Sequence, residues 1–130
     1  MKFVLAVYAA PFSSQASQTA LNFAAALLRE KHQIYRVFFY REGVYTANHS
    51  NWVPQDQQDL CQAWQLLASK QDLDLVVCIA SALRRGVFDQ TEARRYQKGS
   101  PNLAPGFRIG GLGELIDAAV HADRLISFGA

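Results

Sequence analysis

Two cysteines are the residues of this 130-residue chain best suited to covalent chemistry, since a thiolate is a strong nucleophile. Cys78 lies at the end of an apolar run typical of a buried strand, and the next residues, 79–83, can begin a helical turn. Free backbone N–H groups of that turn, with Arg84 or Arg85 nearby, would favour the thiolate of Cys78. A small buried core residue is the alternative interpretation, because free cysteine is among the most buried residue types.

Cys61 has a different sequence environment. It lies on a predicted amphipathic helix beside the apolar residues Leu60 and Trp64. No neighbouring group favours its thiolate, so we predict that Cys61 is a structural residue.

The three histidines offer one alternative chemistry. His32 and His121 lie near predicted helix ends, where a cation suits the helix dipole, and we predict that both are surface residues. His49 lies in a long predicted loop, 41–53, and could approach Cys78. A Cys–His hydrolase is therefore a second hypothesis, although no local sequence signature supports it.

No motif of the chain indicates a metal or a cofactor. There is no Cys-x-x-Cys, and the first predicted strand-to-helix loop lacks the glycines of a nucleotide-binding loop. Gly110, Gly111 and Gly113 precede a predicted helix, and we interpret them as a tight turn with close packing. The pair Arg84 and Arg85 either steers an acidic partner or is simply solvated, and both interpretations stay open.

Composition excludes several classes of protein. Half of the residues are hydrophobic and 18% are charged, which excludes disorder as the main state. The net charge of +2, without a long basic run, argues against direct nucleic-acid binding. No apolar run approaches the roughly 20 residues that span a membrane, and the apolar N-terminus is too short for a signal peptide. We expect a cytoplasmic protein, and the low charge hints that partner chains cover part of its surface.

Hydrophobic periodicity predicts alternating strands and helices in a single domain, 1–130. Strands are predicted at 3–7, 34–40, 74–80, 107–109 and 125–128, and helices at 17–31, from Pro54 through Leu67, at 89–97 and after Gly113. This alternation predicts an α/β fold, a three-layer α/β/α sandwich with a mainly parallel sheet of about five strands. The pattern does not specify the strand order.

Several segments together resemble the TusD/DsrE sulfurtransferase family. Phe38–Tyr45, followed by Ala47–Asn48, resembles the family's loop after its second strand, and Val77–Val87 resembles its active-site region. The match extends through Asp89, Thr91–Ala93, Gly106–Phe107, Gly111–Leu115 and Ala122–Arg124, and so covers essentially the whole chain.

This resemblance implies a sulfurtransferase subunit in which Cys78 accepts sulfane sulfur as a persulfide. It implies a hetero-hexamer with TusB- and TusC-like subunits, a TusA-like donor and a TusE-like acceptor, in the relay that makes 2-thiouridine in tRNA. The alternative branch is sulfur oxidation, with DsrF- and DsrH-like subunits and a DsrC-like acceptor. A non-catalytic scaffold subunit of such a complex is a further alternative. No cofactor, metal, direct nucleic-acid contact or membrane contact is implied.

Overall fold

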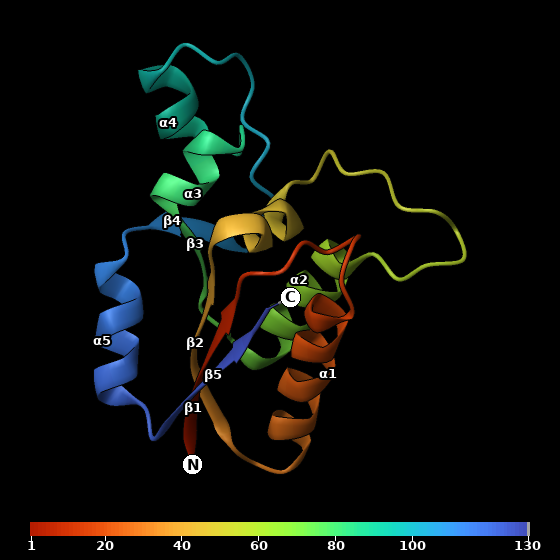
Figure 1. Cartoon of the computed structure of the whole chain (residues 1–130), viewed down its shortest axis with the longest axis vertical. Coiled ribbons are helices and arrows are strands. Elements are labelled where there is room, and N and C mark those ends of the chain that lie inside the picture. Colours follow the sequence, from red (N-terminus) through yellow and green to blue (C-terminus); the bar gives the residue numbers. More distant parts are fainter. Residues whose placement is uncertain (130) are drawn as a thin grey trace.

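The computed structural model describes residues 1–129, which form a five-stranded sheet with helices on both faces (Figure 1). The strands are β1 (Lys2–Val7), β2 (Gln33–Phe39), β3 (Leu75–Cys78), β4 (Phe107–Gly110) and β5 (Arg124–Phe128). The helices are α1 (Gln15–Arg29), α2 (Leu60–Gln71), α3 (Ile79–Arg84), α4 (Gln90–Arg95) and α5 (Gly113–His121), with a 3-10 helix, η1 (Arg41–Ala47). The predicted fold class is confirmed, and every strand pair is parallel.

The strand order is β4-β3-β2-β1-β5. Helices α1 and α2 cover one face of the sheet, α5 covers the other, and α3 and α4 lie beyond the carboxyl ends of the strands (Figure 1). The crossover through α5 carries the chain across the opposite face and places β5 beside β1. None of the helices within residues 1–129 is both long and apolar enough to cross a membrane.

The central strands are apolar along their whole length because both of their faces are buried. On the α1/α2 face, alternate strand residues such as Leu5 and Phe39 pack in one large core with Trp64. On the α5 face, a smaller cluster contains Phe38, Val76 and Cys78. The apolar runs that predicted strands in the sequence are therefore explained by burial on two sides.

Several predicted boundaries were wrong. The second helix begins at Leu60 and not at Pro54, because the Asp59 side chain caps it by accepting a hydrogen bond from the Gln62 N–H. The third strand ends at Cys78 and not at Ala80, because the chain enters α3 at once. The first part of the predicted loop 41–53 is the 3-10 helix η1.

Gly43 allows η1 to lie directly against the end of β1. A Cβ atom at position 43 would collide with the backbone carbonyl group of Val7, so only glycine fits this approach. The carbonyl oxygen of Val7 also accepts a hydrogen bond from Tyr40 N–H at 3.0 Å. The carboxyl end of β1 and the start of η1 are thereby fixed relative to each other.

A network of charged side chains joins the sheet to α5. Arg36 on β2, whose side chain is 11% exposed, donates to Asp74 at 2.8 Å and to the backbone carbonyl of Glu114 at 2.7 Å. Arg108 on β4 donates to the other oxygen of Asp74 at 2.8 Å. Burial alone would raise the pKa of Asp74, but the hydrogen bonds from Arg108 and Arg36 outweigh it and hold that pKa below its usual range.

We expect Arg36→Met to lower the free energy of unfolding by about 2 kcal/mol, because it removes the hydrogen bonds of a largely buried guanidinium to Asp74, Asp117 and the Glu114 carbonyl. Urea unfolding at neutral pH measures this loss, and Arg29→Met, on an exposed residue of α1, should change the free energy by less than about 0.5 kcal/mol. The folded state binds the Asp74 proton less tightly than the unfolded chain does. The ionic part of the stabilisation is therefore fully present above the ordinary aspartate pKa and is lost as the pH falls through the lower pKa of folded Asp74. A difference between the two variants that does not shrink in acid would contradict this account.

Candidate active site

Cys78 is the last residue of β3, at the edge of the sheet where the strands end. Its side chain lies on the α5 face with Phe38 and Val76, and the partly buried Tyr40 and Leu115 pack against this cluster. Only 7% of the residue is exposed. In open parallel sheets, binding and reactive groups gather beyond the carboxyl ends of strands, which is where this thiol lies.

The chain passes from β3 into α3 without a loop. Cys78 occupies the N-cap position of α3 in an extended conformation, and its side chain makes no capping hydrogen bond. Ala82 is fully buried and anchors α3 in the core. The hydroxyl of Ser81 accepts a hydrogen bond from the Arg41 backbone N–H at 2.8 Å, which ties α3 to the start of η1. The first turn of α3, whose N–H groups have no partner within the helix, thus directly follows the residue that bears the thiol.

Arg85 places a cation near Cys78. Its guanidinium forms an ion pair with Glu42 of η1 at 2.7 Å and donates to the carbonyl oxygen of Ser81 at 3.2 Å. The hydrogen bond to Glu42 is the main cause of the raised pKa of Arg85, and the negative charge of a Cys78 thiolate acts in the same direction. The same hydrogen bond lowers the pKa of Glu42. Arg85 is therefore held in place by one carboxylate and lies within electrostatic range of the thiol.

Gly110 is the neighbour of Cys78 on β4. A Cβ atom at this position would lie 2.8 Å from the Cγ1 of Val76 and would collide with the Glu114 carboxylate. At Gly111 and Gly113 an added Cβ would meet nothing within 4 Å. The close packing predicted for this glycine-rich turn is therefore a property of Gly110, which lets α5 approach the sheet next to Cys78.

The histidines do not join this site. Within residues 1–129, the side chain of His49 forms no hydrogen bond with Cys78, and its backbone N–H donates to the carbonyl of Asn102 at 3.0 Å. His121, in the last turn of α5, contacts Asp117 and stacks on Tyr35. His32 lies beside the N-terminal amine, at 3.1 Å. The geometry thus gives no support to a Cys–His hydrolase.

Cys61 lies outside the site, as predicted. It is half-buried on α2 and packs against the large core. Burial, with the nearby charge of Asp59, raises the pKa of the Cys61 thiol to about 11. At neutral pH this thiol is protonated and therefore a poor nucleophile.

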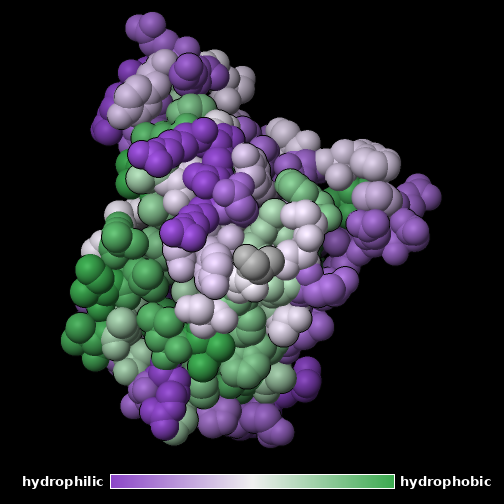
Figure 2. Space-filling model, in the orientation of Figure 1, coloured by the Kyte–Doolittle hydropathy of each residue, from purple (hydrophilic) through white to green (hydrophobic). Residues whose placement is uncertain are grey.

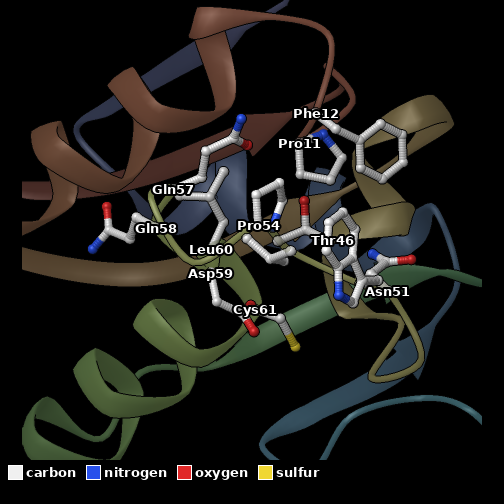
Figure 3. A pocket seen from close by; sticks show the side chains of 12 residues that line it. Pro11, Phe12, Thr46, Asn51, Pro54, Gln57, Gln58, Asp59, Leu60 and Cys61 are labelled. Atoms are coloured by element: carbon white, nitrogen blue, oxygen red, sulfur yellow. The ribbon is translucent and has the colours of Figure 1, made fainter.

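A small cavity of about 60 Å³ lies beside Cys61, between the loop after β1, η1 and the start of α2 (Figure 3). Its walls include Pro11, Phe12, Pro54 and Cys61, and the buried Thr46 hydroxyl, which has no hydrogen-bond partner among residues 1–129. Cys78 is not among the lining residues. The cavity and the candidate nucleophile are thus separate features of the carboxyl end of the sheet.

Comparison with known proteins identifies the family. A model of the DsrE/DsrF-like family matches residues 1–128. The chain belongs to this family. It is 46% identical over 129 residues to the putative sulfurtransferase DsrE of Allochromatium vinosum, with 99% of each chain covered. It is 45% identical over 128 residues to the sulfurtransferase TusD of Salmonella newport, covering 98% of this chain and 100% of that protein.

A crystal structure of the ychN protein from E. coli shares the fold, with a TM-score of 0.80 over 98% of this chain and 99% of that one, at 22% sequence identity. Because the chain belongs to this family and is 45–46% identical to named sulfurtransferases, it is a sulfurtransferase. The resemblance stated from the sequence is therefore confirmed at the level of family, fold and general activity.

Sequence reasoning missed Glu42, the carboxylate that holds Arg85. A signal was present, since Glu42 lies in the segment Phe38–Tyr45 that resembles the family. Arg85 and Glu42 lie 43 positions apart, so their pairing is found only in the structure. The structure also separates the two arginines, because Arg85 turns towards Glu42 whereas Arg84 is exposed.

We expect alkylation of Cys61 to be slow and strongly pH-dependent. In the Cys78→Ser variant, the iodoacetamide labelling rate should rise about tenfold per pH unit from pH 8 to pH 10, since the thiol has a pKa of about 11. Mass spectrometry of the labelled protein at timed intervals measures the rate. A plateau near pH 9, the behaviour of an ordinary thiol, would contradict the assigned environment of Cys61.

Proposed function

We propose that this sulfurtransferase carries sulfur as a persulfide on Cys78 and passes it to a partner protein. The observation that carries the proposal is the position of Cys78 at the junction of β3 and α3, beside Arg85, in a chain 45–46% identical to named sulfurtransferases. Cys61, the other cysteine, has the environment of a protonated core thiol.

The proposed chemistry is a pair of thiol exchanges. The Cys78 thiolate attacks the outer sulfur of a donor persulfide. A bond forms between Sγ and that sulfur as the S–S bond of the donor breaks, and the electron pair leaves with the donor thiolate. In the second step, an acceptor thiolate attacks the same outer sulfur, the Sγ–S bond breaks, and Cys78 returns to the thiolate. No net oxidation occurs, and neither step needs a metal or nucleotide.

The surroundings of Cys78 suit an anionic sulfur. The positive guanidinium of Arg85 and the free N–H groups at the start of α3 stabilise a negative charge at this position. Although the thiol is mostly buried, a sulfane sulfur extends the side chain by one S–S bond of about 2.05 Å. Ile79, which follows it, is partly exposed and Ala80 is exposed, so the outer sulfur of the persulfide has a short path to the surface.

We place this carrier in a cytoplasmic sulfur relay, as the TusD-like subunit beside TusB- and TusC-like subunits. A TusA-like protein would donate the sulfur and a TusE-like protein would accept it for 2-thiouridine synthesis in tRNA. Sulfur oxidation, with DsrF- and DsrH-like subunits and a DsrC-like acceptor, is the second candidate. The similar identities to DsrE and TusD, 46% and 45%, support both branches equally.

The outer surface of α5 supports the proposed assembly. Leu112, Ile116 and Val120 are 55%, 61% and 74% exposed, and they lie on or next to one side of this helix. Leu125 of the edge strand β5 adds to them. Figure 2 shows hydrophobic residues gathered over α5 on this face of the molecule. A contiguous apolar surface is typical of a subunit interface, and we assign it to the partner subunits of the relay.

We expect incubation with a persulfide donor to add one sulfur atom to Cys78. Mass spectrometry of the intact protein and its peptides locates the added atom. The Cys78→Ser variant should take up no sulfur, whereas Cys61→Ser should load as the unchanged protein does. Loading on Cys61, or equal loading of both variants, would overturn the assignment of the carrier.

We expect Ile116→Asp combined with Val120→Asp to abolish assembly with the partner subunits while the chain remains folded. Both side chains are exposed, so the substitutions bury no charge in the isolated chain, but they would bury two carboxylates at the interface. Size-exclusion chromatography after co-expression with TusB- and TusC-like subunits measures assembly, and circular dichroism measures folding. Leu66→Asp, an exposed position on α2, is the matched control and should leave assembly intact.

A further inference from the structure

The charge of this chain is unevenly distributed along the sequence. Residues 79–99 carry five Lys and Arg against two Asp and Glu, a net charge of +3. The remaining residues carry eight against nine, a net charge of −1. The positive charge of the protein is thus concentrated in α3, α4 and the turn that follows them, immediately after Cys78. We call the exposed residues Arg84, Arg94, Arg95 and Lys98 of this segment the basic surface.

Most of this charge is not neutralised within the chain. Arg95 forms an ion pair with the buried Glu92 at 3.2 Å. No carboxylate of residues 1–129 forms an ion pair with Arg84, Arg94 or Lys98. The carboxylate of Asp89 is occupied as the cap of α4, accepting from the Glu92 N–H at 2.8 Å. Three exposed cations therefore present a net positive potential to solvent.

The basic surface lies at the same end of the molecule as Cys78. Helices α3 and α4 project beyond the carboxyl ends of the strands, where Figure 1 shows them at the top of the molecule. Hydrophilic residues gather over this end, away from the apolar surface of α5 (Figure 2). A protein bound here would approach the thiol without covering α5.

We propose that the basic surface is the docking surface for an acidic thiol protein that accepts sulfur from Cys78. This inference rests on the proposed function and names the character of the acceptor. The acceptor thiolate must approach an anionic persulfide, so the two reacting groups repel each other. Unpaired cations beside the site offset this repulsion and speed the encounter with a partner whose thiol is flanked by carboxylates.

The size of the basic surface favours a protein over a nucleic acid. Nucleic-acid affinity rests largely on neutralised phosphates, and a strong DNA-binding footprint comprises about six to ten of these contacts. The three unpaired cations on this segment are too few for such a footprint, but they are enough to steer an acidic protein surface. RNA binding is nevertheless measured as one outcome of the test.

The test follows sulfur transfer from persulfidated Cys78 to two synthetic peptides of equal length. Each has one central cysteine, flanked by aspartate and glutamate in one peptide and by lysine in the other. The full-length chain should transfer sulfur to the acidic peptide about tenfold faster at low salt, a ratio that approaches one near 1 M salt. Mass spectrometry of the quenched peptides gives both rates.

The triple variant Arg84→Glu, Arg94→Glu, Lys98→Glu should reverse the preference for the acidic peptide. The matched control is Arg29→Glu, Lys31→Glu, Lys70→Glu, which makes the same charge change on exposed residues at the far ends of α1 and α2. The control should keep the preference. Loading of Cys78 by a small persulfide donor is measured in every variant, and circular dichroism confirms that each is folded.

Absence of loading in the unchanged protein would contradict the proposed function itself. Normal loading without a preference for the acidic peptide, or an equal loss of preference in both triple variants, would overturn the docking surface alone. Binding of a fluorescein-labelled RNA hairpin that only the Arg84/Arg94/Lys98 variant loses would assign the surface to nucleic acid and also overturn the proposal.

Discussion

The direct passage from β3 into α3 is the constraint on which the candidate site depends. Because no loop intervenes, the backbone at Cys78 is fixed on one side by pairing with β4 and on the other by the buried residue Ala82. A thiol on a flexible loop would have no fixed position relative to α3 and Arg85. Here Cys78, the first turn of α3 and Arg85 belong to one short segment, so the backbone sets their relative positions.

Three contacts from η1 extend this constraint to the rest of the sheet. Gly43 lets η1 lie against the carbonyl of Val7, and Glu42, one residue earlier, then reaches Arg85. The Arg41 N–H donates to Ser81 of α3. The segment after β2 therefore positions the cation near the thiol.

The features predicted correctly from the sequence are those that depend on local residue patterns. Continuous apolar runs predicted the buried strands, and the helix predicted at 89–97 corresponds to α4, which the Asp89 side chain caps. Pro54 misled the prediction because proline is common in the first turn of a helix, whereas here the capping side chain, Asp59, comes five residues later. Spacing alone could not order the strands, because crossover direction depends on how helices pack on the finished sheet.

The sequence did not predict contacts between residues that lie far apart along the chain. In the sequence, Arg36 is a single charged residue within an apolar strand. Only the fold brings it to Asp74 and Asp117, which lie 38 and 81 positions away. The pairing of Arg85 with Glu42 is of the same kind. In both cases an arginine next to buried strands needs carboxylates from other elements, because burying a charge without a partner is costly. A charged residue within an apolar run therefore indicates that such a network exists. It does not identify the residues that form the network.

The two faces of the sheet differ in a way that bears on assembly. The α1/α2 face is covered by two helices that pack against each other, and its core is the larger of the two, with Trp64 and Phe39 fully buried in it. The opposite face is covered by α5 alone, whose inner side packs on the sheet near Cys78 while its outer side exposes Ile116 and Val120. A partner bound to that outer side would bury apolar area without touching the basic end of the molecule. The polar end then remains open to a second protein, so a stable interface and a transient docking event can share one small chain.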